Sequence, residues 1–353
     1  MLNRIDELLN GAHFAGQDGI GKDQLRNWTG AHLAIDFDVL ADIARRVGLS
    51  QFLIQRRGTD QLRGGDGNDS LSGGDGIDQL YGGAGDDFLH SYPIFDLHPN
   101  DVIDGGAGFD TLEFWARNYT GSITIDLNST TGTIRNVEQI LFTGGSGQNH
   151  VLGGAGNDTL WGDVSNDYFD GRGGDDDIRA GDGNDVLIGG AGNDFLDGGN
   201  GGDSLSGGDG NDLLQGWGGN DNLSGGLGDD ELFGADGTNT MTGGAGNDLF
   251  YGSVADMNGD TITDFSAGDR IILLDATLAG FTFSVSGNTL TFTGGSLTLS
   301  GAIKGTIVAT LSSGGGVQLE FNDARNDFNG DGRSDILWRD NTGALTTSLG
   351  QAN

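Results

Sequence analysis

The sequence predicts an all-β protein whose centre is a parallel β-solenoid, or β-roll, with a small helical cap before it and a β-rich flank after it. Three features lead to this prediction: 70 of the 353 residues are glycine, a nine-residue motif G-G-x-G-x-D-x-U-x recurs, and its eighth position, U, is apolar in every copy. Positions seven to nine are predicted to form a minimal strand that buries the eighth side chain. Glycine at positions one, two and four permits a turn with positive φ.

The composition excludes several classes of protein. Only two prolines and no G-X-Y period exclude collagen, and the absence of cysteine excludes disulfide frameworks and thiolate sites. A formal charge of −35 disfavours binding to nucleic acid or anionic membrane surfaces and leaves cations as the natural partners. No apolar run approaches the length of a membrane span, so we expect no transmembrane segment. The first ten residues lack the apolar core of a cleavable signal peptide, so any export is expected to use another route.

Residues 1–54, before the repeats, are predicted to form a helical cap. The apolar residues between Val39 and Val47 fall on one helical face after Asp38, which can cap the helix. Covering the open end of a solenoid is the simplest role for this segment, and a remnant of a larger domain is the alternative.

Two blocks of repeats follow. The first, residues 55–113, contains six units interrupted by a five-residue insert, Ser91 to Phe95, and the main array, residues 144–252, contains twelve contiguous units. Across these 18 units the sixth position is Asp in 16, the exceptions being Asn149 and Asn239. If two units make one coil, the main array has six turns, and each sixth-position residue stacks over the one two units later.

The remaining segments lie between and after the two blocks. Residues 114–143 are predicted to be an elaborated β insertion with a strand at Ile123 to Leu127. Residues 253–322 are predicted to be a β-rich flank, and residues 323–353 contain a single D-x-N-x-D-G-x-x-D motif. The strands expected in the flank are Thr261 to Phe265, Ile271 to Leu274, Phe281 to Val285 and Val317 to Phe321.

The stacked aspartates predict calcium sites. Carboxylates about 4.8 Å apart repel one another by about 0.9 kcal/mol per pair even in water, so we expect the metal-free array to be a disordered glycine-rich spacer. Ca²⁺ reverses the repulsion because it accepts about six to eight carboxylate and carbonyl oxygens, whereas Mg²⁺ requires a tighter octahedron and the sequence offers no repeated Cys or His for Zn²⁺. The candidate carboxylate ligands are Asp69, Asp78, Asp87, Asp110, Asp158, Asp167, Asp176, Asp185, Asp194, Asp203, Asp212, Asp221, Asp230 and Asp248.

A separate calcium loop is predicted near the C-terminus, where alternate oxygen side chains converge around a glycine. It is not a complete EF-hand, because Trp338 stands where that motif has Glu, and it is more similar to the calcium loop of FG-GAP or VCBS repeats. Its candidate ligands are Asp327, Asn329, Asp331 and Asp335.

The nonapeptide array resembles the repeat-in-toxin (RTX) calcium-binding repeat over about half of the chain. The resemblance implies a calcium-bound β-roll in which each ion lies between loops two units apart, held by both sixth-position aspartates and by backbone carbonyls. The implied pairs run from Asp158 with Asp176 to Asp230 with Asp248. The resemblance also implies export to the extracellular space by type I secretion machinery. The glycines implied to supply carbonyls are Gly154, Gly156, Gly190, Gly192, Gly208 and Gly210.

Some units depart from the motif. Asn149 and Asn239 each remove a carboxylate near one end of the main array, and we expect weaker calcium sites there because fewer ligand charges lower the affinity. The residues that replace the second or fourth glycine are Asp163, Arg172, Trp217, Ala235 and Ser165.

No catalytic motif accompanies the repeats. The sequence lacks the H-E-x-x-H of zinc proteases and the G-x-S-x-G of lipases. His90, Asp96 and His98 lie close together near the insert, where we expect a surface loop rather than a metal site. We therefore interpret the chain as a secreted calcium-binding protein that folds on extracellular Ca²⁺ and has no catalytic activity of its own.

Two alternative functions stay open. The chain could be the C-terminal secretion and folding module of a truncated RTX enzyme, such as a protease, lipase or alginate epimerase. It could instead be a surface-layer or adhesion protein with a cell-surface or glycan partner. A catalytic reading frame immediately upstream would favour the first, and chelator-sensitive binding to cells or glycans would favour the second.

Overall fold

A computed structural model describes a large part of the chain, and all of the described residues fall in one compact unit that spans residues 44–353. The predicted helix between Val39 and Val47 and the predicted calcium loop at 327–335 lie outside the described residues. The described ranges are 52–54, 59–74, 77–91, 101–117, 119–127, 134–300, 306–322, 336–339 and 345–348.

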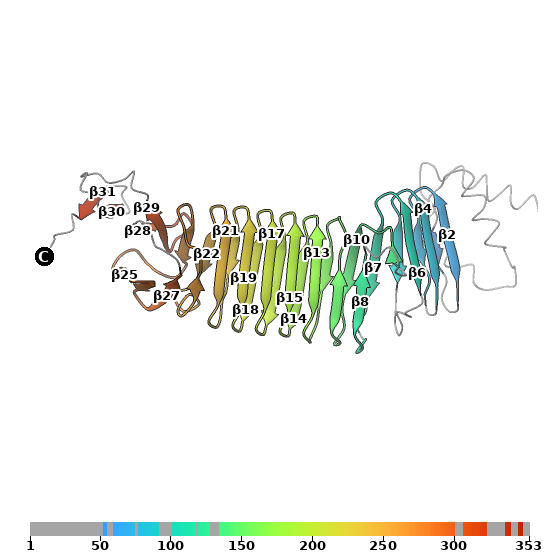
Figure 1. Ribbon diagram of the computed structural model, residues 1–353, viewed down its shortest axis with the longest axis horizontal. Coiled ribbons are helices and arrows are strands. Elements are labelled where there is room, and N and C mark those ends of the chain that lie inside the picture. The colour runs from blue at the N-terminus through green and yellow to red at the C-terminus, as the bar shows by residue number, and fades with distance from the viewer. Residues whose placement is uncertain are drawn as a thin grey trace, which may run out of the picture. The chain divides into compact units, whose positions relative to one another are not determined.

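The described residues form strands and turns without a helix, and most strands join two long sheets (Figure 1). Accordingly, the described part contains no helix that is long and apolar enough to cross a membrane. The 14-stranded sheet contains, in spatial order, β1 (Phe52–Ile54), β3 (Ser70–Ser72), β5 (Phe88–Ser91), β7 (Thr111–Trp115), β10 (Gln139–Thr143), β12 (Thr159–Trp161), β14 (Asp177–Asp182), β16 (Phe195–Asn200), β18 (Leu213–Gly218), β20 (Glu231–Phe233), β22 (Leu249–Gly252), β24 (Arg270–Leu273), β29 (Val317–Asn322) and β28 (Thr306–Leu311).

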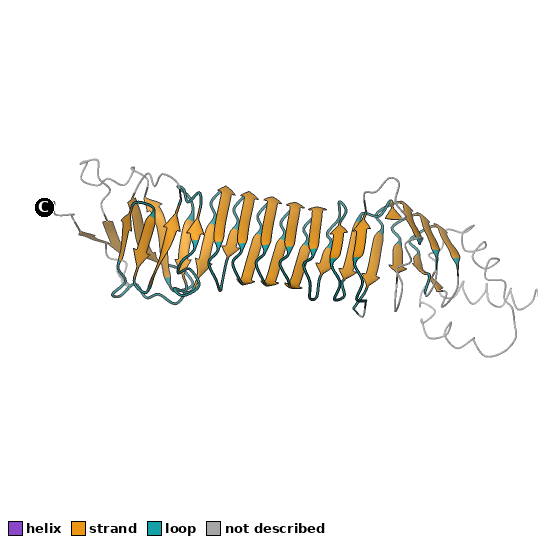
Figure 2. Ribbon diagram, turned by 60° about the horizontal axis from the view of Figure 1, so that its bottom comes forward, coloured by secondary structure: helices purple, strands orange, loops and turns teal. Residues whose placement is uncertain are grey.

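The 11-stranded sheet faces the main array's part of the 14-stranded sheet (Figure 2). It contains β8 (Ile123–Asp126), β11 (Asn149–Leu152), β13 (Tyr168–Gly173), β15 (Val186–Ala191), β17 (Ser204–Asp209), β19 (Asn222–Leu227), β21 (Thr240–Ala245), β23 (Thr261–Ile262), β27 (Gly295–Leu299), β26 (Thr289–Phe292) and β25 (Phe283–Ser286). The smaller sheets are β2 (Gln61–Asp66), β4 (Gln79–Ala84), β6 (Val102–Ala107) and β9 (Ile134–Arg135), and the hairpin of β30 (Ile336–Arg339) with β31 (Leu345–Ser348).

The main array alternates between the two long sheets, so two consecutive strands make one coil. Phe169 pairs in parallel with Leu187, and Leu187 pairs with Leu205, each 18 residues later. The predicted parallel β-roll with two units per coil is confirmed. Its strands are longer than the three residues expected: Val186–Ala191 runs through the first three positions of the next unit. The strand continues because Gly190, with φ of 118°, still pairs with Gly208.

The core is a column of eighth-position side chains between the sheets. These side chains are buried in all 18 units, and strands of the main array alternate buried and more exposed residues, as in β18 and β21. Burying one such side chain contributes about 1.5–3 kcal/mol relative to leaving it exposed. Two aromatic side chains of the insertion, Phe114 and Phe142, extend the core toward Phe169 of the main array, with the rings of Phe114 and Phe142 5.7 Å apart and those of Phe142 and Phe169 5.8 Å apart.

The insert at Ser91 to Phe95 leaves the sheets continuous, whereas residues 114–143 divide one side of the solenoid: the four-stranded sheet ends at β9 and the 11-stranded sheet begins at β8. Leu80 pairs with Ile103 across the insert, so the five extra residues leave the strand register intact. The strand predicted at Ile123 to Leu127 is present as β8, which pairs with β11 of the main array. Residues 114–143 therefore carry the 14-stranded sheet from the first block to the second through β7 and β10.

The C-terminal flank first continues the coils and then ends them with antiparallel strands. β23 and β24 pair in parallel with the last strands of the array. β29 and β28 then close the 14-stranded sheet, and β26 and β25 close the 11-stranded one, all by antiparallel pairing. The four predicted flank strands are present, the first of them shortened to β23.

Three of the residues that replace the second glycine are forced into left-handed backbone. Arg172, Trp217 and Ala235 have φ of 72°, 66° and 60°. This conformation costs an L-residue about 1–2 kcal/mol. At these three positions the fold keeps the glycine conformation although the sequence has another residue, whereas Asp163 at the same position of its unit does not have positive φ.

Candidate metal sites in the turns

Each coil of the main array buries one sixth-position side chain in each of its two turns. All twelve are at most 3% exposed. They form two files along the coils, which we call the first file and the second file. The first file is Asn149, Asp167, Asp185, Asp203, Asp221 and Asn239, and the second file is Asp158, Asp176, Asp194, Asp212, Asp230 and Asp248.

One carboxylate oxygen of each aspartate accepts a hydrogen bond from the coil before it. The backbone N–H of Asp158 donates to Oδ1 of Asp176 at 2.7 Å, and that of Asp176 donates to Oδ1 of Asp194 at 2.8 Å. The second file continues in this way to Asp230 and Asp248, at 3.1 Å. The structure thus places the predicted pairs side by side, and their role as shared ligands stays a prediction.

The other oxygen, Oδ2, is buried without a hydrogen-bond partner in most of these aspartates. It lies inside the turn: a Cβ built on Gly207 would fall within 3.0 Å of both Asp212 Oδ2 and the carbonyl oxygen of Gly225. A buried acceptor without a donor costs about 1–3 kcal/mol, and more when it is charged. The aspartates of the two files whose Oδ2 is buried without a hydrogen-bond partner are Asp176, Asp185, Asp194, Asp203, Asp212, Asp221, Asp230 and Asp248.

Burial raises the pKa of these carboxyls well above the ordinary value of 3.8. The pKa is about 8 for Asp176, about 7 for Asp158 and Asp203, and about 6 for Asp185 and Asp194. Loss of solvation is the largest cause in each, and the neighbouring carboxylates of Asp158 and Asp194 raise the pKa of Asp176 further. The turns therefore favour a state in which each carboxylate holds a proton or a cation.

Backbone carbonyls line the space between successive turns. A Cβ built on Gly208 or Gly210 would fall within 3.0 Å of the carbonyl oxygens of Gly190 and Gly192, one coil earlier. Among the described residues no three Asp, Glu or His side chains converge on one point, so a cation here would complete its coordination from these carbonyls. The predicted glycines of the later units take positive φ, 118° at Gly190 and 123° at Gly208. Gly154 and Gly156 instead pack against the carbonyl of Glu138, outside the repeats.

The two asparagines place an amide nitrogen where the aspartates have Oδ2. Asn149 Nδ2 donates to the Asp167 carboxylate at 3.1 and 3.2 Å and to the carbonyl oxygen of Gly145 at 3.4 Å. Asn239 Nδ2 donates to the carbonyl oxygen of Ala235 at 3.3 Å and hydrogen-bonds to the next acid in its file. The amide therefore joins a carbonyl to a carboxylate, the two kinds of group that Ca²⁺ would bridge. The donor chemistry of the turn fits a cation, and at the two asparagines an N–H group takes its place.

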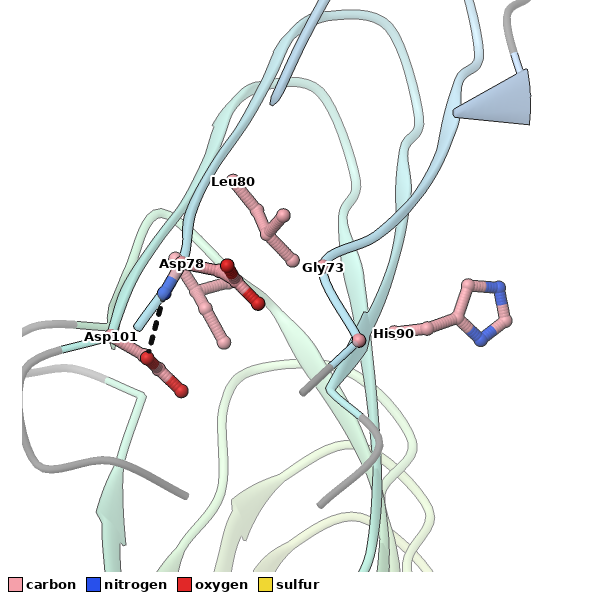
Figure 3. Close-up of a pocket in the computed structure, with 7 residues that line it drawn as sticks. Gly73, Asp78, Leu80, His90 and Asp101 are labelled. Atoms are coloured by element: carbon pink, nitrogen blue, oxygen red, sulfur yellow. Dashed lines mark hydrogen bonds between the residues drawn. The ribbon is translucent and has the colours of Figure 1, made fainter. Parts of the chain in front are cut away.

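The first block repeats this arrangement, and two of its contacts close longer loops. The backbone N–H of Asp78 donates to Oδ1 of Asp101 at 2.9 Å, inside the turn shown in Figure 3. Asp69 donates in the same way to Asp87, and Asp87 to Asp110, each at 2.8 Å. Two of these contacts span 23 residues rather than 18, so the insert lengthens a loop and leaves the contact between coils unchanged.

Three acids outside the recognised units extend the files, and the sequence analysis missed them. Glu138, Asp260 and Asp269 accept backbone N–H groups of the preceding coil across 28, 21 and 21 residues. Each precedes a buried isoleucine by two positions, which is the D-x-U ending of the nonapeptide, and this signal could have identified them. The donors are Asp110, Asn239 and Asp248, at 2.8, 2.7 and 3.1 Å.

A ladder at the fifth position, outside the turns, was also missed. Oδ1 of Asn157 accepts the N–H of Asp175 at 2.9 Å, Oδ1 of Asp175 accepts that of Asn193 at 2.7 Å, and Oδ1 of Asn193 accepts that of Asn211 at 2.9 Å. The earlier residue accepts here, whereas the later residue accepts in the two files. The signal was available, because the fifth position is Asn or Asp in nine of the twelve units of the main array.

A polar cluster lies on the outer face of the 14-stranded sheet. His90 Nδ1 is 2.6 Å from Glu113 Oε2, and His90 Nε2 is 3.2 Å from Ser70 Oγ, which is the order of groups in a nucleophilic triad. The side chain of His90 points away from the carboxylates of the neighbouring turn (Figure 3). Asp96 and His98, which the sequence places near His90, lie outside the described residues.

The repeats match a known family model. A family model described as the RTX calcium-binding nonapeptide repeat matches residues 56–89, 100–113, 143–178, 170–205, 197–232 and 233–256. These segments are the coils that carry the buried aspartates. The C-terminal motif lies outside them, so its likeness to FG-GAP or VCBS repeats stays a prediction. No curated protein matches the chain.

Proposed function

Because the chain is an RTX-type repeat protein that carries calcium-binding repeats, we propose that it is a secreted protein whose β-solenoid folds when extracellular Ca²⁺ fills its turns. The observation that carries this proposal is the set of buried Oδ2 atoms in the two files that have no hydrogen-bond partner. They lie inside the turns near backbone carbonyl oxygens, as Asp212 Oδ2 does beside the carbonyl of Gly225. Ca²⁺ bound between turns would give each of them a partner of opposite charge.

The energetics support coupling of folding to calcium. A site filled to about ten times its dissociation constant adds about 1.4 kcal/mol to stability, and about ten such sites give an upper bound near 14 kcal/mol. This is comparable with the whole stability of a typical domain. A chain that meets little calcium inside the cell would stay extended, which suits export by type I secretion machinery, and would fold outside.

We further propose that the chain has no catalytic activity of its own. Ser70 lies on β3, which pairs with β1 on one side and β5 on the other, so neighbouring backbone N–H groups serve the sheet instead of stabilising an oxyanion. The Ser70–His90–Glu113 contacts are then links between outer-face side chains of neighbouring strands. Labelling of Ser70 by a fluorophosphonate would contradict this part of the proposal.

Circular dichroism in the far ultraviolet tests the central claim. Purified chain freed of metal is titrated with CaCl₂, with MgCl₂ as the control and chelator to reverse the change. We expect a cooperative gain of β-structure at about 0.1–1 mM Ca²⁺ that Mg²⁺ does not reproduce. A spectrum that is already fully folded without metal, or that stays disordered at high calcium, would refute the proposal.

A further inference from the structure

The outer faces of the two long sheets differ in chemistry. All three tryptophans whose side chains the structure describes lie on the outer face of the 14-stranded sheet: Trp115, Trp161 and Trp217, which are 50%, 38% and 46% exposed. Beside Trp161 the outer face of the 11-stranded sheet carries the stacked rings of His150 and Tyr168, whereas in the coils around Trp217 it carries small polar residues. These are Ser204, Ser206, Asn222, Ser224, Thr240 and Thr242. A solenoid coil does not require exposed tryptophan, so the aromatic face needs another explanation.

The aromatic side chains belong to one row that crosses the strands. Strand register places the row's first seven residues next to one another, and ring stacking adds Tyr251, whose ring lies 5.3 Å from that of Phe233. We call this set the aromatic row: Trp115, Thr143, Trp161, Arg179, Asp197, Gln215, Phe233 and Tyr251. It is aromatic toward both ends and polar in the middle. Trp161 and Phe233 are four strand steps apart, about 19 Å, so the row suits an extended ligand.

Trp217 lies beside the row in a strained conformation. It occupies the second position of its unit, where most units have glycine, and its φ is 66°. Its ring meets Phe233 edge-on at 5.7 Å, and its side chain hydrogen-bonds to Asp197. Arg172 and Ala235 have the same left-handed conformation at the same position of their units, so the fold imposes it and it is not by itself a sign of function. At Trp217 it places an indole that is almost half exposed next to the row.

The charges around the row restrict the ligand. Arg179 is paired with Asp177 at 2.7 and 3.0 Å, and Asp197 and Glu231 leave the surface acidic on a chain of formal charge −35. Anionic glycans, nucleic acid and anionic lipid are therefore repelled. Aromatic rings offer flat apolar surface to the C–H faces of sugar rings, and the carboxylates and the Gln215 amide accept hydrogen bonds from hydroxyl groups.

We propose that the aromatic row, with Trp217 beside it, binds an extended, uncharged polysaccharide that lies across the strands along the row. This rests on the proposed function, because the row exists only when the coils are folded. It adds a ligand to that function: a polymer of neutral sugars that stacks on Trp161, Trp217 and Phe233.

The test is electrophoresis of the full chain in calcium through native gels that contain a polysaccharide. Hydroxyethylcellulose, soluble starch and galactomannan are the uncharged probes, and carboxymethylcellulose is the anionic comparison. We expect retardation by at least one uncharged probe and none by carboxymethylcellulose. Trp217→Gly and Trp161→Thr should each weaken the retardation about tenfold or more, as truncation of a central aromatic residue does at other interfaces.

The variants separate binding from folding. Trp217→Gly restores the residue of the motif and removes the left-handed strain, so it should fold at least as well as the parent. Tyr168→Thr is the matched control, because Tyr168 is an aromatic residue of β13 in the 11-stranded sheet, stacked on His150 at 4.5 Å, and its loss should leave retardation unchanged. Folded protein that no uncharged probe retards, or retardation equal in Trp217→Gly and parent, overturns this inference and leaves the proposed function intact. A chain that calcium does not fold overturns both.

Discussion

The sixth residue of the unit places a carboxylate oxygen inside the turn in the interior of the main array and an amide nitrogen there at its two ends. In the interior, Asp185 and Asp203 bury an Oδ2 atom that has no hydrogen-bond partner. At the ends, Asn149 and Asn239 place an N–H group at that point and bridge a carbonyl to a carboxylate. The contact to the preceding coil is kept at Asn239, whose Oδ1 accepts the Asp221 N–H, whereas Oδ1 of Asn149 is buried without a hydrogen-bond partner. Under the proposed function, the need of a turn for calcium is therefore set by the sixth residue of its unit and not by the solenoid itself.

Proton binding should partly replace calcium in the interior, and this is the largest effect that we expect because many carboxyls act together. Their pKa is 3.8 when unperturbed and about 6 to 8 in the metal-free fold. Between those values the folded state binds more protons than the unfolded state, so stability falls as pH rises through about 6 to 8. Metal-free protein should gain β-structure when the pH is lowered from about 8 to about 5.5.

Circular dichroism of dialysed, metal-free protein at the two pH values checks this, with light scattering to detect aggregation near the pI of 4.1. In calcium the order reverses, because protons compete with Ca²⁺ for the same oxygens, so the calcium concentration needed for folding should rise as pH falls. Equal disorder at both pH values without metal would show that carboxylate charge does not oppose folding.

Single substitutions in the middle of the second file sharpen the comparison. Asp194→Ala removes the acceptor of the Asp176 N–H and one ligand, and should lower the free energy of unfolding in saturating calcium by about 1–3 kcal/mol. Asp194→Asn keeps the acceptor and copies the array ends, so it should cost less. Urea denaturation in calcium, with calorimetry to count bound ions, compares the two. Equal losses would show that the Oδ1 contact contributes nothing.

Sequence periodicity predicted the fold because one nine-residue pattern controls strand, turn and core together. The apolar eighth position and the glycines gave the coil of two units, and the sixth position gave the files that run from Asp158 and Asp167. Prediction failed where the spacing changed. Glu138, Asp260 and Asp269 join the files across 28 or 21 residues, and a pattern of fixed length cannot find them.

Two other features could not be read from the sequence, because they depend on contacts across coils. The aromatic row joins Trp161 to Phe233 through strands that are neighbours only after the chain has coiled. The asparagines were expected to mark weaker calcium sites, which stays a prediction. In the structure each amide N–H has acceptors within hydrogen-bond distance. The end turns therefore lose a carboxylate ligand for a cation, and they also lose the unpartnered oxygen that a cation would neutralise.

The smallest effect should come from Asn239→Asp, which replaces the amide of an end turn by the carboxylate that the interior turns have. The new carboxylate would face the Asp260 side chain and the Ala235 carbonyl without a donor, so the metal-free state should lose about 1–3 kcal/mol, while calcium gains one carboxylate ligand. We expect the calorimetric count of bound calcium to rise by about one and the midpoint of the calcium titration to move to higher concentration. Asn220→Asp makes the same charge change at an exposed fifth position whose oxygen already accepts the Thr238 N–H, so it should alter neither quantity. If both variants behave alike, net charge and not the bridging amide governs the ends of the array.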